Sequence, residues 1–518
     1  MRYGFAIDQR TCIGCHACTV ACKTEHEIPV GQFRTWVKYV DSGEFPNSTR
    51  DFGVMRCNHC TDAPCVKICP TKALFTRDDG IVDFDRDRCI GCKSCMQGCP
   101  YDAIYIDEDT HTAAKCNFCA HRIDENIEPA CVVVCPTHSI WVGDLEDPTS
   151  GISKLITTNP VSVRAPEQNT GPNVFYLGAD RAVLDPLLAP VGDSYLFSRP
   201  DGHRRQVSGD LRSYPITRDP ITDARTTLNT AHPRPWGWRV TTYLWTKAVA
   251  AGAMLLAALA RLLGIDLGAL GDVVAPAIGL AGVGITGALL VWDLKRPERF
   301  WFIFAKPNPR SWLFWGSVAL SAGAGFFALW LLVGILGAVG VLSAATTGSI
   351  LFGLAVPTLP AAVLTTGYTA FLFGQAEGRD LWQSPLLFWH LIVQAVMVGG
   401  GALVIAAAVS GLGGPARTLL VGALTLATVV HIVMVLFEYC GWHPTANAAA
   451  AAHLALYGRY AATFWGGGIA VAGLAAVLAA IGWAGPVVVA AAGALLVQVA
   501  MLAYESVFVR AGQDVPLS

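Results

Sequence analysis

Sixteen of the seventeen cysteines lie between residues 12 and 135 and fall into four groups of four. The groups are Cys12-x2-Cys15-x2-Cys18-x3-Cys22, Cys57-x2-Cys60-x4-Cys65-x3-Cys69, Cys89-x2-Cys92-x2-Cys95-x3-Cys99 and Cys116-x2-Cys119-x11-Cys131-x3-Cys135. In the last three groups a proline follows the fourth cysteine. The third group matches the bacterial spacing for iron–sulfur ligation, in which three cysteines hold one cubane and the fourth serves its neighbour. Sixteen thiolates match four 4Fe–4S clusters with four ligands each.

Zinc and disulfide bonds are the alternative uses of so many cysteines. Four-thiolate zinc sites are built from two C-x2-C pairs, whereas triplets with a remote fourth cysteine and a trailing proline are typical of cubane ligation. Disulfide scaffolds are common in small secreted domains, but the triplets leave the sulfur atoms too close together for an ordinary ladder of bridges. We therefore favour iron–sulfur ligation. Because the surrounding core is small, we also expect the clusters to stabilise the region that binds them.

The charged residues divide the chain into two parts. Residues 1–235 hold 55 of the 76 charged side chains, and residues 236–518 hold only 21. The first part is therefore of a soluble type, and the second is typical of a membrane protein. This division excludes a single globular enzyme, a disordered protein and a coiled coil. The net charge of −2 offers no electrostatic basis for binding nucleic acid.

Two short apolar runs, 80–85 and 103–107, predict small strands between the cysteine groups. We therefore expect an α+β, ferredoxin-like double domain over residues 1–180. Prolines, glycines and charged residues follow without cysteines, so 181–235 is interpreted as a linker. The remaining residues, 236–518, are expected to form an all-α bundle of eight transmembrane helices.

Eight hydrophobic runs are long enough to cross a bilayer. They lie near 241–263, 273–293, 313–337, 347–373, 385–409, 416–439, 459–482 and 484–508. On the side of the cysteine-rich region the loops hold nine Lys and Arg residues, against two, Arg261 and Arg417, on the other side. The positive-inside rule then predicts a cytoplasmic cysteine-rich region, and the lack of a visible signal segment agrees. The alternative is a periplasmic region. In that case these cations dock the cysteine-rich region or a partner, and a partner that bears a signal segment exports the assembly.

The cysteine pattern resembles the four-cluster electron-transfer subunits of molybdopterin oxidoreductases, those of dimethyl sulfoxide reductase, polysulfide reductase and the NrfC group. The local strings are Cys12-Ile-Gly-Cys-His-Ala-Cys and Arg56-Cys-Asn-His-Cys. The resemblance covers about residues 1–180 and implies that cysteines of different groups combine around each cluster. The implied ligand sets are Cys12, Cys15, Cys18 and Cys135; Cys116, Cys119, Cys131 and Cys22; Cys57, Cys60, Cys65 and Cys99; and Cys89, Cys92, Cys95 and Cys69.

The second part resembles NrfD/PsrC-type quinone-interacting membrane subunits, which are usually separate polypeptides. The strings that carry this resemblance are Trp292-Asp-Leu-Lys-Arg-Pro-Glu-Arg-Phe, Gly367-Tyr-Thr and Val509-Arg-Ala-Gly-Gln. It implies a quinone site in which Tyr368 helps to bind the headgroup and the first-span residues Tyr243 and Lys247 face it. The expected quinone is menaquinone or ubiquinone. Tyr243 departs from the family pattern, because it stands where we align a family histidine.

Two further polar residues lie in the sixth apolar run. His431 and Glu438 are seven residues apart, so both lie on one helical face. An ionisable group at membrane depth is expensive and indicates a function by default. These two residues are candidates for a proton path to the quinone, and the alternative is that they bond neighbouring helices.

The two resemblances together predict an electron-transfer and quinone-binding membrane subunit of a respiratory oxidoreductase. Four clusters would connect a separate catalytic subunit, expected to be of molybdopterin type, with the membrane quinone pool. The chain shows no nucleotide-binding glycine motif and no catalytic organic centre, so substrate chemistry is expected on the partner. Two alternatives stay open: a redox-linked proton-translocating module, and a plain membrane anchor without a quinone site.

Overall fold

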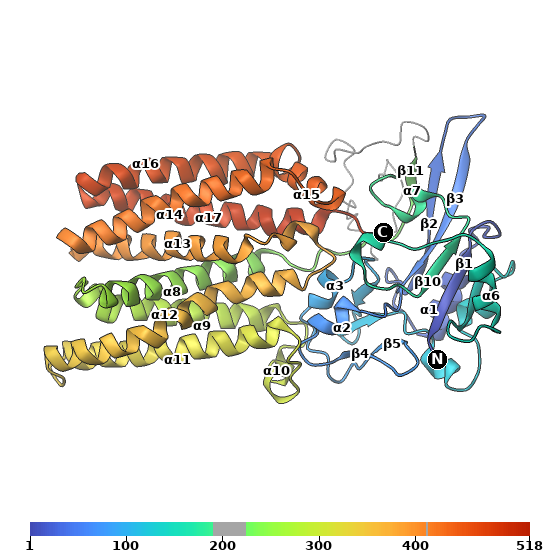
Figure 1. Ribbon diagram of the computed structural model, residues 1–518, viewed down its shortest axis with the longest axis horizontal. Helices are drawn as coiled ribbons and strands as arrows, with labels where there is room; N and C mark the ends of the chain where they lie inside the picture. The colour runs from blue at the N-terminus through green and yellow to red at the C-terminus, as the bar shows by residue number, and fades with distance from the viewer. Residues whose placement is uncertain (190–223, 411–412) are drawn as a thin grey trace.

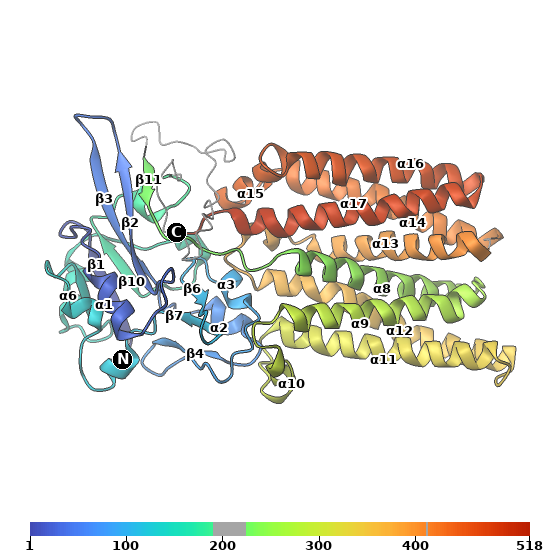
Figure 2. The same ribbon diagram turned by 180° about the vertical axis from the view of Figure 1, so that it is seen from behind.

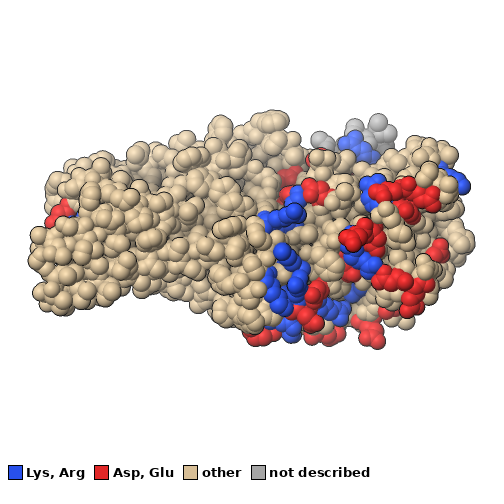
Figure 3. Space-filling model, turned by 60° about the horizontal axis from the view of Figure 1, so that its bottom comes forward, with Lys and Arg blue, Asp and Glu red and all other residues tan. Residues whose placement is uncertain are grey.

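The computed structural model describes residues 1–189, 224–410 and 413–518. An α+β region with the sixteen clustered cysteines lies at one end of the molecule, and a bundle of long helices extends from it (Figure 1). This arrangement confirms the predicted fold class. Charged side chains gather over the α+β region and the junction, whereas most of the visible bundle surface carries none (Figure 3).

Strand β1 (Tyr3–Asp8) is central to the four-stranded sheet of the α+β region. It pairs in parallel with β10 (Val174–Leu177) and antiparallel with β8 (Ile140–Asp144), and β9 (Val161–Ser162) completes the order β8-β1-β10-β9. Alternate side chains of β1 point to opposite faces, so Phe5 and Ile7 enter one core and Ala6 enters another.

The other strands form one three-stranded sheet and two hairpins. The elements are β11 (Arg225–Leu228), β2 (Thr35–Ser42) and β3 (Thr49–Arg56) in the sheet, with β4 (Leu74–Thr76) and β5 (Val82–Phe84), and β6 (Ile104–Ile106) and β7 (Ala113–Lys115), in the hairpins. Strands β5 and β6 lie within the predicted runs 80–85 and 103–107.

Four short helices begin beside the cysteine loops: α1 (Ala17–Glu25), α2 (Pro64–Ile68), α3 (Ser94–Gly98) and α5 (Ala130–Val133). The first and third cysteine loops follow the same backbone path. Gly14 and Gly91 both have φ +67°, and the residues two places on, His16 and Lys93, are also left-handed. Glycine adopts this conformation without steric cost, which allows each loop to turn tightly enough for its cysteines to converge.

Three more helices, α4 (Ala120–Ile123), α6 (Gly151–Thr158) and α7 (Arg181–Leu184), complete the α+β region. The predicted linker, 181–235, contains α7 at its start and β11 near its end. Strand β11, which the sequence did not indicate, pairs antiparallel with β2, and α7 packs on β2 and β3. Residues 190–223, which carry most of the linker prediction, lie outside the described residues.

The described residues contain eight helices long and apolar enough to cross a membrane. They are α8 (Trp238–Leu262), α9 (Ala275–Asp293) with the π turn before it (Leu270–Val274), α11 (Trp312–Ala338), α12 (Ala344–Gly374), α13 (Leu387–Ser410), α14 (Gly414–Cys440), α16 (Val471–Ala484) with its preceding π segment (Ala462–Ala470), and α17 (Val487–Asp514). Each overlaps one predicted run. The chain is therefore a multi-pass membrane protein.

Helix α8 is the central helix of the bundle (Figure 2), since 83% of its most apolar window is buried against 33–61% for the other seven. It packs closely on α13. A Cβ atom at Gly252 would collide with the backbone of Ala395, and one at Gly399 would collide with the backbone of α8. Small residues thus allow the two backbones to touch, as is common between membrane helices.

The α+β region rests on one end of the bundle, near the short helices α10 (Phe302–Ala305) and α15 (Ala446–Leu456). Polar contacts join the two parts. Lys93 Nζ lies 2.7 Å from a carboxylate oxygen of Asp293, and Asn308 Nδ2 donates to the Cys69 carbonyl at 2.7 Å. Arg379, which is 2% exposed, pairs with Asp102 at 3.2 Å. The cysteine loops are therefore held directly against the ends of the membrane helices.

Candidate functional site

Two of the four cysteine sets each surround one small cavity. Cys12, Cys15, Cys18 and Cys135 line the first, and Cys57, Cys60, Cys65 and Cys99 line the second. In each case three cysteines come from one group and the fourth comes from another, more than thirty residues away in sequence. The fold brings the fourth cysteine back because α3 and α5 sit beside α2 and α1 respectively.

The other two sets are related by electrostatic interactions between their thiols. Burial and the neighbouring thiols of Cys116, Cys131 and Cys119 raise the pKa of Cys22. Burial and then Cys92, Cys89 and Cys69 raise the pKa of Cys95 in the same way. Each fourth cysteine again lies beside three cysteines of another group.

These surroundings fit iron–sulfur clusters. All seventeen cysteines are free thiols, and twelve of the sixteen grouped ones are buried with four less covered: Cys12, Cys15, Cys92 and Cys135. Backbone N–H groups point at sulfur, for example Gly91 to Cys89 at 3.4 Å and Ser139 to Cys135 at 3.3 Å. Such bonds stabilise cluster sulfur atoms and tune their potential. Among the described residues no three His, Cys, Asp or Glu come close enough to hold a single metal ion.

Cationic side chains accompany the buried thiols. Arg56, with no exposed surface, donates from Nη1 to Cys131 Sγ at 3.3 Å, and two of its other nitrogen atoms have no partner among the described residues. Burial raises the pKa of Cys18 to about 12, so this thiol is neutral at pH 7 when no metal binds it. Since thiolates are the metal ligands, cluster binding must displace such protons.

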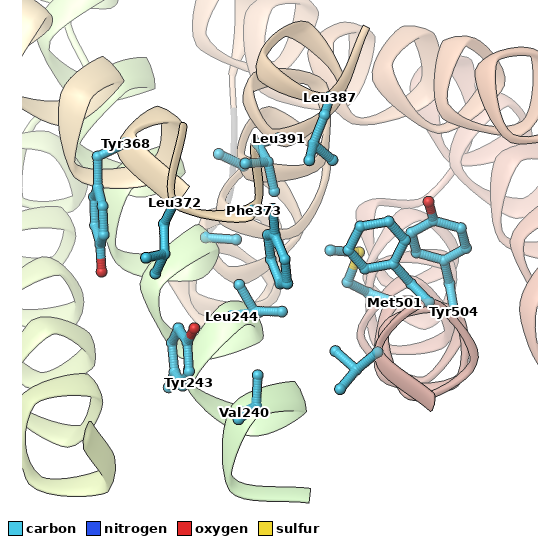
Figure 4. Packing of buried hydrophobic residues seen from close by; sticks show 14 of the residues in the cluster. Val240, Tyr243, Leu244, Tyr368, Leu372, Phe373, Leu387, Leu391, Met501 and Tyr504 are labelled. Atoms are coloured by element: carbon cyan, nitrogen blue, oxygen red, sulfur yellow. The ribbon is translucent and has the colours of Figure 1, made fainter. Parts of the chain in front are cut away.

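An apolar cavity of about 300 Å³ lies where the α+β region meets the bundle. Its walls come from α8, α9, α10, α11 and α12, and Cys92 and Ser94 of the third cysteine loop close one side. Tyr243 from α8 and Tyr368 from α12 both line it, with Leu372 one turn beyond Tyr368. Figure 4 shows these three side chains together between α8 and α12, apart from Tyr504 on α17. Ser94, Ser317, Ser321 and Asp293 are the other polar residues of the lining, and the remaining walls are mainly apolar side chains. The cavity is thus suited to a largely apolar molecule that carries a few polar atoms.

The position of Tyr368 depends on its neighbours. Its ring packs so closely on α11 that a Cβ atom at Gly316 would collide with it. Lys247 Nζ lies 4.9 Å from the ring centroid and also donates to Thr369 Oγ1. A cation over an aromatic face is attracted by the ring. Lys247 therefore contacts the ring of Tyr368, but it does not line the cavity.

His431 and Glu438 lie apart from the cavity, in a series of hydrogen bonds that crosses two helices. His390 Nδ1 lies 3.0 Å from Glu438 Oε2, and His390 Nε2 lies 2.9 Å from His431 Nδ1. Ser384 Oγ donates to the other oxygen of Glu438 at 2.7 Å. The fold thus joins His431 to Glu438 through His390.

Some of the cations counted for membrane topology contact the α+β region. Arg296 donates to the Thr110 carbonyl at 3.3 Å, Arg299 donates to the carbonyls of Arg86 and Cys89, and Arg379 pairs with Asp102. These three of the nine cations therefore have a docking role. Their positive charge would be needed at this junction on either side of the membrane.

Comparison with protein families finds two matches along the sequence. The 4Fe-4S dicluster domain matches residues 49–145, and the family described as polysulphide reductase, NrfD, matches residues 226–515, which is more than half of the protein. The second match begins within β11, and residues 146–225 lie between the two matches.

Comparison with curated proteins finds relatives of about one third of the sequence. A subunit of the tetrathionate reductase of Salmonella typhimurium is 45% identical over 191 residues, covering 36% of this protein and 76% of the relative. One of the chains of the polysulfide reductase of Wolinella succinogenes is 39% identical over 187 residues, covering 36% of this protein and 98% of the relative. Protein NrfC of Escherichia coli is 43% identical over 164 residues, covering 31% and 73%.

Proposed function

This protein belongs to the polysulphide reductase NrfD family and carries a fused 4Fe-4S dicluster domain, and from this we propose its function. It is an iron–sulfur electron-transfer subunit joined to an NrfD-type membrane subunit of the kind found in respiratory reductases. In our proposal it relays electrons through four 4Fe–4S clusters between a separate catalytic subunit and the membrane quinone pool. In this proposal the clusters are bound by residues 1–180, the quinone is bound within residues 236–518, and residues 181–235 link the two parts.

The apolar cavity at the junction is the observation that carries this proposal. Cys92, a proposed ligand of the cluster held also by Cys69, Cys89 and Cys95, lines the same cavity as Tyr243 and Tyr368. A quinone headgroup needs hydrogen-bond donors at its two oxygen atoms and an apolar path for its tail. The cavity supplies both next to a cluster ligand, which a plain membrane anchor would not require.

In our proposal, the other three clusters extend from that cavity away from the membrane. Their ligands are the sets gathered around Cys99, Cys22 and Cys135, with thiols that are free and largely buried. When bound, the clusters supply one-electron carriers. The chain's own residues position the thiols, exclude water and provide the N–H groups and cations around the sulfur atoms.

A catalytic partner is the further part of the proposal. Relatives of the iron–sulfur region are named as parts of tetrathionate, polysulfide and arsenate reductases, so they belong to multisubunit enzymes. We propose that this protein likewise serves a separate catalytic subunit of molybdopterin type. Copurification of a large subunit containing molybdenum or tungsten tests this proposal, and isolation as a complete complex without one would contradict it.

We propose a cytoplasmic position for the iron–sulfur region. Setting aside Arg296, Arg299 and Arg379, which dock that region, six of the nine cations remain on its side against two on the other. The asymmetry therefore persists after the docking residues are removed. A reporter fused after Ser518 should be active in the cytoplasm, and an active periplasmic reporter would place the region outside.

Replacement of Tyr368 by phenylalanine tests the quinone site, because it removes one hydroxyl group and keeps the ring. Clusters reduced by dithionite in the intact protein are mixed rapidly with a menaquinone or ubiquinone analogue in liposomes, and their reoxidation is followed optically. We expect Tyr368→Phe to slow reoxidation roughly 100-fold, the lower end of the range for losing a positioned proton donor. Tyr457→Phe, at an exposed tyrosine outside the cavity, is the matched control. Failure of the unmodified protein to react with either quinone would refute the quinone site.

A further inference from the structure

Two nitrogen-bearing side chains contact sulfur atoms of one proposed cluster ligand set, the Cys22 set, which consists of Cys22, Cys116, Cys119 and Cys131. Arg56 Nη1 donates to Cys131 Sγ at 3.3 Å. His26 Nε2 lies 3.2 Å from Cys119 Sγ. Because a metal-bound sulfur atom has no proton to donate, the His26 ring must carry its proton on Nε2 to bond it. In the other three sets, the described hydrogen bonds that reach sulfur within 3.5 Å start from the backbone N–H groups of His59, Gly91, Ala113 and Ser139.

Arg56 is buried without a carboxylate partner. Its side chain has no exposed surface, and none of the ion pairs among the described residues involves it. Its Nε and Nη2 atoms have no hydrogen-bond partner in that part of the chain. Lys115, which also has no exposed surface, differs because it donates to the carbonyls of Val82 and Cys116. A buried cation is costly unless a negative charge balances it, so the balancing charge of Arg56 must come from the sulfur ligands and the cluster that they hold.

The fold delivers both side chains to the Cys22 set. His26 directly follows α1 and lies four residues after Cys22, so the two residues lie on one side of a helical turn. Arg56 is the last residue of β3, and Cys57, a proposed ligand in another set, follows it. The Arg56 guanidinium group lies 4.4 Å from the ring centroid of Phe5 on β1, which helps to hold it in place. Arg56 thus extends from the backbone beside one ligand set to a sulfur atom of another.

The two donors act on the charge that a cluster gains when it is reduced. A cubane with four thiolate ligands is an anion, and reduction adds one electron to it. Hydrogen bonds from a guanidinium group are charge-assisted, so they stabilise an acceptor more as its negative charge increases. In a buried site with a low effective dielectric constant this difference is larger than in water. Donation by Arg56 and His26 therefore favours the reduced form of the cluster.

We propose that Arg56 and His26 raise the reduction potential of the cluster held by the Cys22 set, with Arg56 supplying the larger part. This inference rests on the proposed four-cluster function. In the step concerned, one electron leaves a neighbouring cluster, which is oxidised, and enters the cluster of the Cys22 set, which is reduced. No covalent bond breaks and no proton moves. The electron then stays on this cluster longer than its four thiolates alone would allow.

Redox titration of the intact protein, followed by electron paramagnetic resonance, measures this potential. The unmodified protein should show four one-electron steps. Arg56→Met keeps an apolar stem and removes the charge, so one step should become roughly tenfold less favourable, which is a shift of about 59 mV to lower potential. Arg56→Lys keeps the charge but not the fork, so the shift should have the same direction and be smaller. His26→Phe removes the neutral donor and keeps a ring, so the same step should become roughly threefold less favourable.

Arg50→Met is the matched control for these variants. Arg50 belongs to the same strand as Arg56, but it donates to Asp41 at 2.7 Å and not to sulfur. Its replacement should leave all four potentials unchanged. Cys119→Ser identifies the cluster, because loss of this ligand should remove the step that Arg56→Met shifts. Iron analysis of each variant shows whether the clusters are bound.

A shift confined to the step that is missing in Cys119→Ser supports the inference. Unchanged potentials in Arg56→Met at full iron content would overturn it, and so would a shift in a step that persists in Cys119→Ser. If Arg56→Met loses iron, Arg56→Lys and His26→Phe decide, and unchanged potentials in both would overturn the inference. Absence of cluster signals from the unmodified protein would instead refute the proposed four-cluster function.

Discussion

The iron–sulfur region and the helical bundle are built on opposite principles. The first has short strands and helices, several small hydrophobic cores and many buried thiols. The second has eight long helices that contact one another through glycine and alanine. The first therefore depends on what its cysteines bind, whereas the second can pack through its own side chains.

The two regions also place their chemistry differently. In the iron–sulfur region one residue type repeats at fixed spacing, so a single loop carries most of a site. In the bundle single polar residues from different helices meet, as Tyr243 and Tyr368 do at the cavity. A substitution in the first region is expected to change local folding, and one in the second to change reaction with quinone while the fold remains.

The largest expected effect is the loss of a cluster. Cys95, buried in α3, is a proposed ligand, and Cys95→Ser should remove about four of roughly sixteen irons per protein molecule. The loop around α3 should then become sensitive to protease, because its packing depends on the metal. Iron analysis and limited proteolysis measure the two effects. Cys440→Ser, at the exposed seventeenth cysteine, is the control, and full iron content in Cys95→Ser would show that the ligand set is wrong.

This difference between the regions also explains what sequence could predict. Four cysteine groups and eight apolar runs were sufficient for the fold class, because spacing and hydropathy are local properties. The cavity brings together Cys92, Tyr243 and Tyr368 from three distant segments. Tyr243 and Tyr368 were predicted through a family resemblance, and no local pattern indicated that Cys92 would line the same space.

His390 shows where sequence reasoning stopped. It lies at the junction end of α13, where a histidine is commonly structural, and its bonds to Glu438 and His431 arise from packing of α13 on α14. Helical spacing within α14 correctly placed His431 and Glu438 on one face, but it could not supply the residue between them. Strand β11 was missed for a related reason, since its four residues depend on pairing with β2.

The next effect concerns the contact between the two regions. Burial opposes ionisation of Asp102, but Arg379, His232 and Arg234 outweigh it and lower its pKa. The ion pair therefore stabilises docking above the unfolded carboxyl pKa of about 3.9 and is lost as pH falls through the lower folded value. Asp102→Asn should lower the local opening free energy of α3 and residues 513–518 by about 2 kcal/mol, because Arg379 stays buried with fewer acceptors. Hydrogen exchange measures this change.

The exposed Asp109 provides the control for that experiment, since Asp109→Asn should leave exchange at α3 unchanged. Asp102→Asn should also remove the acid-dependent part of docking, so the protection of α3 should depend less on pH below about 4. Equal protection in both variants across this range would mean that the regions are joined without help from the Asp102–Arg379 pair.

A smaller effect is expected from moving Tyr368 without changing its chemistry. Gly316→Ala introduces a methyl group that collides with the Tyr368 ring. The ring must shift in the cavity, so we expect the quinone concentration giving half-maximal reoxidation to rise roughly 10-fold, about 1.4 kcal/mol. Gly325→Ala, on the same helix where a methyl group meets open space, is the control. If both variants need the same quinone concentration for half-maximal reoxidation, Tyr368 does not contribute to quinone binding.

The smallest effect is expected at the end of the bundle away from the iron–sulfur region. Trp330 on α11 is 1% exposed and donates from Nε1 to the Gly271 carbonyl at 3.1 Å. Trp330→Phe keeps most of the apolar contact and loses one hydrogen bond, so stability should fall by about 1 kcal/mol. Thermal unfolding of the bundle measures this loss. Because the apolar cavity lies at the opposite end, reoxidation by quinone should keep its unmodified rate, and a slower rate would extend the functional region through the whole bundle.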